Sequence, residues 1–451
     1  MWSFETDPEY QEKLDWARAF VREEIEPIDV LFQQDELYNV NNESVRAIVK
    51  PLMQKVRDKG LWACHLPESL GGNGYGQLKL ALLNEVLGRS FAAPTVFGTA
   101  APDTGNAEIL AHFGTEAQKK TYLQPLLNGD IVSCYSMTEP QGGSDPKQFK
   151  TRAVRQPDGT WRLNGYKWYS SNARFAAFII VFAVTNPDVP VHEGASLFII
   201  PAGHEGVKIL RNAGNPADPP GVGCEGYIHY DNVRLTDADL LGGVGDAFKI
   251  AQTRLGGGRI HHAMRSVAQA QKAFDWMCTR ALSRFTQGTK LSEKQMVQDV
   301  IAESWMAIQQ FRLLVLHTAW KIDKVKNYRE VREDIAAAKT LAAKIVIDTV
   351  TKAMHIHGSL GLSNEMQFGD MLARGFIMGV ADGPDEVHKI TIAKQILRKY
   401  HADEGVFPDA HLLRQVTHAM DKYHSELQLP GFKSPWIEHA RKLRAEGLID
   451  C

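Results

Sequence analysis

A β-rich block over residues 131–241 interrupts a chain whose pattern is otherwise helical, and this order constrains the fold most strongly. The block contains two continuous apolar runs, FAAFIIVFAVTN and ASLFIIPA, which are typical of buried strands. It also contains two alternating runs that meet at a PDG turn, which predict a β-hairpin. We therefore expect a compact β domain, barrel-like or sandwich-like, between two helical regions.

The flanking regions have the period of amphipathic helices. Before the block, apolar residues such as Leu14, Ala17 and Val21 recur at steps of three and four. After it, three long periodic segments predict an antiparallel bundle, with Ser292 capping the second segment and Gly358 ending the third. The predicted class is α+β, mainly α. Its domains are an N-terminal helical domain (1–130), a central β domain (131–245), a C-terminal four-helix bundle (246–400) and a helical extension (401–451).

Composition excludes several classes of function. The net charge of -2 gives no general attraction to nucleic acid, and no apolar run is long enough to span a membrane. The five cysteines are scattered and form no CxxC pair, so we expect neither a disulfide framework nor a metal site. The acidic start of the sequence has no secretory or transit pattern, and we expect a cytoplasmic protein.

Three stretches carry possible chemistry, and each also has an ordinary structural interpretation. In ADGPDEVHK, Gly383 and Pro384 can simply start a helix, or Asp382 can be an active-site carboxylate held before that helix. TEPQGGSD (138–145) follows a strand and is either a ligand loop or a hairpin loop. GYKWYSSNA (165–173) suits a flat cofactor but equally suits a strand with aromatic residues.

Together, and in this order, these stretches resemble the acyl-CoA dehydrogenase family of flavoproteins. The resemblance extends to about Lys399 and includes RFTQGTKLSEKQMVQ (284–298) and HIHGSLGLSNE (355–365). APDTGNAEIL and DGPDEVH also look like the subgroup found in animals as dehydrogenase domains fused to a phosphotransferase-like kinase domain, although we expect no such fusion here. ADGPDEVHK stands where the family has a glutamate base.

The resemblance implies a role for each matching residue. Asp382 would be the catalytic base, and Ser144, Arg259 and Gly383 would contact the acyl-CoA substrate. Arg284 would reach the FAD of a neighbouring subunit. The full FAD-contacting set would be Tyr135, Met137, Thr138, Gly143, Ser144, Tyr169, Ser171, Arg284, Gln287, Gln295, His355, Gly358, Ser359, Pro384 and Glu386.

The sequence departs from the family pattern at several of these positions. An aromatic residue is replaced by Gln287, a flavin-contacting glutamine by His355, and a pyrophosphate-loop glycine by Ser359. Pro384 replaces a threonine and cannot donate a backbone N–H. The base position holds Asp382, one methylene shorter than the usual glutamate.

The implied activity is FAD-dependent α,β-dehydrogenation of an acyl-CoA to a trans-2-enoyl-CoA. Asp382 would remove the α-proton, and the β-hydride would pass to flavin N5. Electron-transfer flavoprotein would accept the electrons, and the assembly would be a homodimer or homotetramer. Two alternatives remain open: an oxidase of the same fold, such as nitroalkane oxidase with its aspartate base, and a non-catalytic FAD-binding scaffold.

Overall fold

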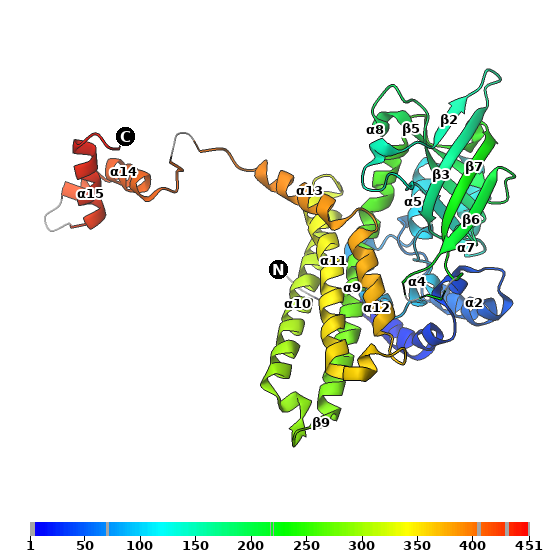
Figure 1. Cartoon of the computed structure of the whole chain (residues 1–451), viewed down its shortest axis with the longest axis horizontal. Helices are drawn as coiled ribbons and strands as arrows, with labels where there is room; N and C mark the ends of the chain where they lie inside the picture. The colour runs from blue at the N-terminus through cyan, green and yellow to red at the C-terminus, as the bar shows by residue number, and fades with distance from the viewer. Residues whose placement is uncertain are drawn as a thin grey trace. The chain divides into compact units, whose positions relative to one another are not determined.

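The computed structural model describes residues 5–68, 72–216, 218–219, 221–403, 407–428 and 433–449. The chain divides into two compact units, Met1–Ile392 and Ala393–Cys451. Within the first unit, a helical region is followed by a β domain and then by long helices, in the order that the sequence predicts (Figure 1). The domain boundaries proposed from the sequence remain predictions.

The N-terminal region is a set of helices around an apolar core that includes Leu14, Ile25 and Phe97. Asp7 caps the first helix, because its carboxylate accepts a hydrogen bond from the backbone N–H of Tyr10 (3.0 Å). The helices are α1 (Pro8–Phe20), α2 (Glu43–Asp58), α3 (Gly76–Leu87), α4 (Ala93–Val96), α5 (Asp103–Phe113), α6 (Glu116–Gln118) and α7 (Gln124–Asn128).

The β domain is one mixed sheet in the order β6-β7-β3-β2-β4-β5-β8, with β1 paired in parallel to β4. The PDG hairpin is confirmed: β2 and β3 are antiparallel, and Gly159 has the positive φ (82°) that its turn requires. The short helix α8 (Val191–Gly194) precedes β5. The strands are β1 (Ser133–Ser136), β2 (Arg152–Arg155), β3 (Trp161–Ser170), β4 (Phe178–Val184), β5 (Ala195–Pro201), β6 (Val207–Ala213), β7 (Glu225–Leu235) and β8 (Leu240–Leu241).

Strand β4 shows why the apolar runs are continuous rather than alternating. Phe178 and Phe182 point into a core shared with α5, α7 and the start of α9. Ile179 and Val181 point into a second core shared with β3 and β7. Because both faces of the strand are covered, both sets of side chains are buried.

The long helices are α9 (Ala247–Ser283), α10 (Gln295–Val325), α11 (Arg332–His357) and α12 (Phe368–Val380), and α13 (Asp385–Leu397) follows them. A small hairpin of β9 (Phe285–Thr286) and β10 (Thr289–Lys290) joins α9 to α10. The prediction that Ser292 caps α10 is wrong, because Leu291–Glu293 forms a 3₁₀ turn and Lys294 precedes the helix. Gly358, with φ 65°, ends α11 as predicted.

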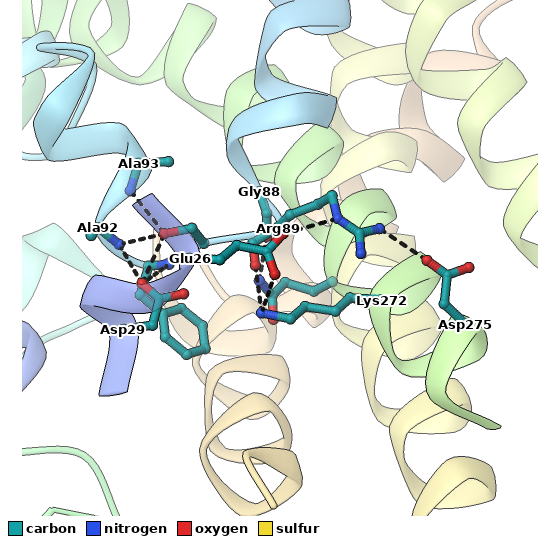
Figure 2. A network of polar contacts seen from close by, with 11 residues as sticks. Glu26, Asp29, Gly88, Arg89, Ala92, Ala93, Lys272 and Asp275 are labelled. Atoms are coloured by element: carbon teal, nitrogen blue, oxygen red, sulfur yellow. Dashed lines mark hydrogen bonds and ion pairs between the residues drawn. The ribbon is translucent and has the colours of Figure 1, made fainter. Parts of the chain in front are cut away.

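A polar network joins the N-terminal helices to the bundle (Figure 2). Arg89 bridges Glu26 (3.2 Å) and Asp275 on α9 (3.0 Å). Lys272, almost fully buried on α9, donates to the backbone carbonyl of Arg89 (2.8 Å) and lies 3.6 Å from Glu26. Asp29 accepts hydrogen bonds from Ser90 and from the backbone N–H groups of Phe91 and Ala92. This network fixes the segment before α4 against α9, where that segment forms one wall of the cavity described below.

The second unit contains α14 (Leu412–Lys422) and α15 (Pro435–Ala445). Ser434 caps α15, and Arg444 forms a bidentate pair with Asp421 on α14 (both 3.0 Å). Among the residues that the structure describes, no helix is sufficiently long and apolar to cross a lipid bilayer.

Candidate active site

A cavity of about 350 Å³ lies where the N-terminal helices, the β domain and the bundle meet. Helix α9 contributes polar side chains to its wall, including His262, Arg265 and Gln269, and α12 contributes Ile377 and Met378. The end of β3 and the start of β7 close another side. Asp382 lines this cavity, so the carboxylate singled out in the sequence lies at its wall.

The backbone of Asp382 is held in an unusual conformation. Its φ is 56°, a left-handed value that aspartate tolerates better than most residues, and Gly383 follows with φ 98°. The Asp382 carbonyl oxygen accepts hydrogen bonds from Nη2 of Arg259 and Nε2 of His388, both at 3.2 Å. Lys339 on α11 then pairs with Asp385 at 3.1 Å, which secures the start of α13. These contacts hold the Asp382 side chain at the cavity wall.

Three arginines of α9 make this region electropositive. Arg259 is next to Asp382, and burial lowers its pKa although the Asp382 carboxylate raises it. Burial lowers the pKa of Arg265 to about 10, and its guanidinium donates to Asn84 and to the carbonyl of Thr99. Arg254 lies over the Tyr135 ring (4.1 Å to the centroid). A negative charge that develops in the cavity would therefore be stabilised.

The structure brings together the two segments that the sequence predicts to hold flavin. The backbone N–H of Trp168 donates to the carbonyl of Thr138 (3.0 Å), and Nζ of Lys167 donates to the carbonyl of Met137 (2.6 Å). Lys167 also forms a fully buried ion pair with Glu139 (2.8 Å). Burial lowers the pKa of Lys167 to about 8, although Glu139 raises it. The loop that carries Thr138 is thus attached to strand β3.

Within this pair of segments the predicted contacts differ in exposure. Ser171 lines the cavity, whereas the side chain of Tyr169 is 59% exposed and its backbone has a positive φ of 47°. Gly143 and Ser144 are exposed at the tip of the loop, and Met137 and Thr138 are half-buried. The arrangement presents an accessible surface beside the cavity, which suits a ligand larger than the cavity itself.

The remaining predicted contacts lie elsewhere in the bundle. Arg284 follows α9, Gln287 lies in the turn between β9 and β10, and Gln295 begins α10. The β9 hairpin lies at the end of the bundle opposite to α13 (Figure 1). His355, Gly358 and Ser359 are exposed at the C-terminal end of α11. None of these residues lines the cavity of its own chain. Pro384 and Glu386, by contrast, follow Asp382 directly at the start of α13.

Several cavity residues were not singled out as site residues from the sequence. His262, Arg265 and Glu225 line the cavity, and none of the three is among the site residues that the sequence predicts. Glu225 begins β7 and accepts a hydrogen bond from the Ser171 hydroxyl (2.9 Å). The sequence has no local signal for these residues, because they meet only when α9 and β7 pack beside residues distant in the chain. In the described part of the chain, no cluster of three or more His, Cys, Asp or Glu side chains could hold a metal ion.

Glu225 should make the stability of the ligand-free protein depend on pH. Burial raises its pKa to about 7, although the Ser171 hydroxyl lowers it, whereas an unfolded glutamate ionises near pH 4.3. Between these values the folded protein keeps a proton that the unfolded chain has lost, so stability falls as pH rises towards 7. The free energy of unfolding is measured with urea for Glu225→Gln and wild type at about pH 5 and about pH 8. The difference, variant minus wild type, should be on the order of 2 kcal/mol larger at about pH 8 than at about pH 5.

The matched control is Glu303→Gln, which changes an exposed glutamate of α10 and should leave the pH dependence of wild type unchanged. Burial also raises the pKa values of Asp103 and Glu108 to about 7. Both residues remain in every variant, so they contribute equally to the pH dependence of stability of all the proteins compared. An identical pH dependence in Glu225→Gln and wild type would mean that Glu225 is not buried as described.

The sequence of this chain is similar to those of known proteins. Models of the acyl-CoA dehydrogenase N-terminal, middle and C-terminal domains match residues 7–130, 134–231 and 245–397. The probable acyl-CoA dehydrogenase FadE2 of Mycobacterium tuberculosis is 39% identical over 364 residues, which cover 78% of this chain and 86% of that protein. The chain belongs to the acyl-CoA dehydrogenase family. The resemblance inferred from the sequence motifs is thereby confirmed.

Acyl-CoA dehydrogenase family member 11 of Rattus norvegicus is 35% identical over 397 residues, covering 86% of this chain but 50% of that protein. The chain thus spans about half the length of this animal relative. Among solved structures, a putative acyl-CoA dehydrogenase from Mycobacterium abscessus superposes with a TM-score of 0.82 at 33% identity, covering 88% of this chain and all of that one. Butyryl-CoA dehydrogenase from Megasphaera elsdenii superposes with a TM-score of 0.74 at 26% identity. The predicted fold, with helical, β and helical domains, is confirmed.

Proposed function

We propose that this acyl-CoA dehydrogenase family member, with FAD bound, removes one hydrogen from each of the α and β carbons of an acyl-CoA thioester and forms a trans-2-enoyl-CoA. The observation that carries the proposal is the position of Asp382. Its carboxylate lines the cavity that Ser171 also lines, and its backbone is held by Arg259 and His388. A fixed carboxylate in a confined site is what abstraction of a weakly acidic α-proton requires.

The residues around the cavity fit the flavin that the family uses. The Tyr135 hydroxyl and the side-chain amide nitrogen of Asn172 are buried polar groups without a protein partner among the described residues. Such groups are costly unless a ligand or water bonds them. A volume of about 350 Å³ suits a ring system or an acyl group, whereas the whole dinucleotide would extend over the neighbouring surface of Gly143, Ser144 and Tyr169. FAD, when bound, supplies the hydride acceptor.

Each residue near Asp382 then has a specific task. Asp382 takes the α-proton, and the negative charge that moves onto the thioester oxygen is stabilised by the electropositive wall of α9. Arg259 and His388 fix the Asp382 main chain, so the shorter aspartate side chain starts from a defined position. Ser144, Arg259 and Gly383 are proposed to contact the CoA thioester on the strength of the family resemblance.

A homodimer or homotetramer completes the proposal. Arg284, Gln287 and the end of α11 lie away from the cavity of their own chain and are exposed, as expected of groups that serve a neighbouring subunit's FAD. Electron-transfer flavoprotein is the proposed electron acceptor, and a cytoplasmic location remains the prediction from the sequence.

The test is anaerobic mixing of the FAD-loaded protein with acyl-CoAs that differ in length and branching. Because His262, Arg265 and Gln269 make part of the lining polar, hydroxylated chains are included beside aliphatic ones. Loss of the visible flavin band with at least one thioester is expected. If nitroethane, and no thioester, reduces the flavin and oxygen then yields peroxide, the protein is instead an oxidase. If nothing reduces the bound flavin, a scaffold role replaces catalysis.

A further inference from the structure

A second, smaller chamber adjoins the cavity at Asp382. It has a volume of about 50 Å³ and is lined by Thr99, Ala101, Thr104, Gly105, Arg254, Gly258, His261, His262, Arg265 and Asp382. Asp382 and His262 line both hollows, as do Arg254 and Arg265. The carboxylate that faces the cavity therefore also has access to a polar space that the acyl group need not occupy.

His262 is the titratable side chain that faces Asp382 most closely across this boundary. Its Nε2 lies 3.9 Å from Oδ2 of Asp382, and the two side chains are 30% and 27% exposed. A distance of this size becomes a hydrogen bond after a small side-chain rotation. An imidazole in this position can exchange a proton with the carboxyl group.

The charges around His262 favour a neutral imidazole that passes a proton on. Burial lowers its pKa, Asp382 raises it, and Arg265, Arg254 and Lys339 lower it further. His261, the preceding residue on α9, also lies beside it. Neutral His262 can thus accept a proton. Because the neighbouring cations repel the imidazolium that forms, it gives up this proton readily.

The chamber offers the next acceptor. Nε2 of His261 is buried, and within the described residues no protein group bonds it, so it needs a ligand such as water. A hollow of about 50 Å³ is large enough for at least one water, because about 10–15 Å³ suffices. The hydroxyl groups of Thr99 and Thr104 supply further hydrogen-bonding partners.

We propose that His262 resets Asp382 by accepting its newly acquired proton and releasing it to water in the small chamber. The inference rests on the proposed function, in which Asp382 takes the α-proton. The Oδ2–H bond of Asp382 breaks as an Nε2–H bond forms on His262, and the imidazolium then gives the proton to water. Only a proton moves in these steps, so they require no oxidant or reductant.

The test follows the fate of the α-hydrogen. The probe is the α-dideuterated form of the acyl-CoA that reduces the flavin fastest in the panel above, mixed anaerobically with FAD-loaded protein in ordinary water. Reversal of the reaction returns hydrogen to the α-carbon, so the recovered thioester shows by mass whether the deuteron exchanged with solvent. The quantity compared is the amount of α-deuterium exchanged per flavin reduced in the same sample. A merely structural defect lowers both amounts together and leaves this ratio unchanged.

Wild-type protein should return thioester that has exchanged its α-deuterium. His262→Gln keeps a polar side chain but cannot accept the proton. It should lower the exchange per flavin reduced by at least about tenfold. This threshold is set below the roughly 10²–10⁴-fold effect that a positioned acid–base group usually has. His262→Asn is a second variant, and His192→Gln, exposed on α8, is the control that should match wild type.

The outcomes separate the two proposals. If no thioester reduces the flavin, the proposed function fails and the inference fails with it. If flavin reduction occurs but exchange is the same in His262→Gln and wild type, only the role of His262 is overturned. If wild type itself returns the deuteron without exchange, the role of His262 is overturned whether or not the variants fold.

Discussion

The Asp382→Asn variant is expected to bind FAD with an unchanged visible spectrum and to be reduced by acyl-CoA about two to four orders of magnitude more slowly than wild type. An amide has nearly the size of the carboxylate but cannot take up the α-proton. The contacts of the Asp382 carbonyl with Arg259 and His388 do not involve the side chain, so the backbone should be unaffected. Anaerobic stopped-flow absorbance measures the rate directly.

The control for this variant is Asp348→Asn. Asp348 pairs with Lys344 on the surface of α11, so its loss should leave the rate of flavin reduction unchanged. If Asp382→Asn, with FAD bound, were reduced at close to the wild-type rate, another group would have to be the base. Glu225 would then be the first candidate, because its carboxyl lines the same cavity.

The second large effect is expected from Lys167→Met. Lys167 and Glu139 are an ion pair in which both side chains are buried (0% and 1% exposed). Removal of one partner leaves a buried carboxylate whose remaining partners are the backbone N–H groups of Lys150 and Thr151 and the Gln141 side chain. Such a loss costs about 3–5 kcal/mol. Urea unfolding should show this decrease, and FAD binding should weaken because the loop that carries Thr138 loses the Lys167 contacts with Met137 and Glu139 that help attach it to β3.

Two controls separate burial from charge. Arg155→Met removes a surface pair with Asp237, in which each side chain is about half exposed, and should cost no more than about 1 kcal/mol. Combining Lys167→Met with Glu139→Gln should recover part of the lost stability, because the buried charge is also removed. A Lys167→Met protein as stable as wild type would show that the pair is not buried.

The sequence predicts those parts of the fold that local chemistry determines. The PDG turn, the apolar runs of β4 and β5, and Gly358 at the end of α11 all appear where expected. The order of helical, β and helical regions follows from the change in periodicity. Ser292 is the exception, because a capping residue type is not sufficient when the chain makes a 3₁₀ turn before the helix.

The candidate site is only partly predictable from the sequence. Asp382 and Ser171 were identified from motifs and both line the cavity. His262 and Glu225 were not, because their roles depend on which elements pack beside them. His262 and Asp382 are 120 positions apart in the chain, and no periodicity in one sequence indicates their contact. The residues around the Asp382 carboxylate are therefore determined by long-range packing and not by local sequence.

Product analysis tests the central claim, dehydrogenation of an acyl-CoA with Asp382 as the base, most directly. FAD-loaded wild type and Asp382→Asn are each incubated with the most reactive acyl-CoA and ferrocenium as electron acceptor, and the thioester is analysed by mass spectrometry. The expected result is a product that has lost one pair of hydrogens with wild type, and unchanged thioester with Asp382→Asn. Unchanged thioester with wild type for every acyl-CoA, or equal product from both proteins, would contradict the claim.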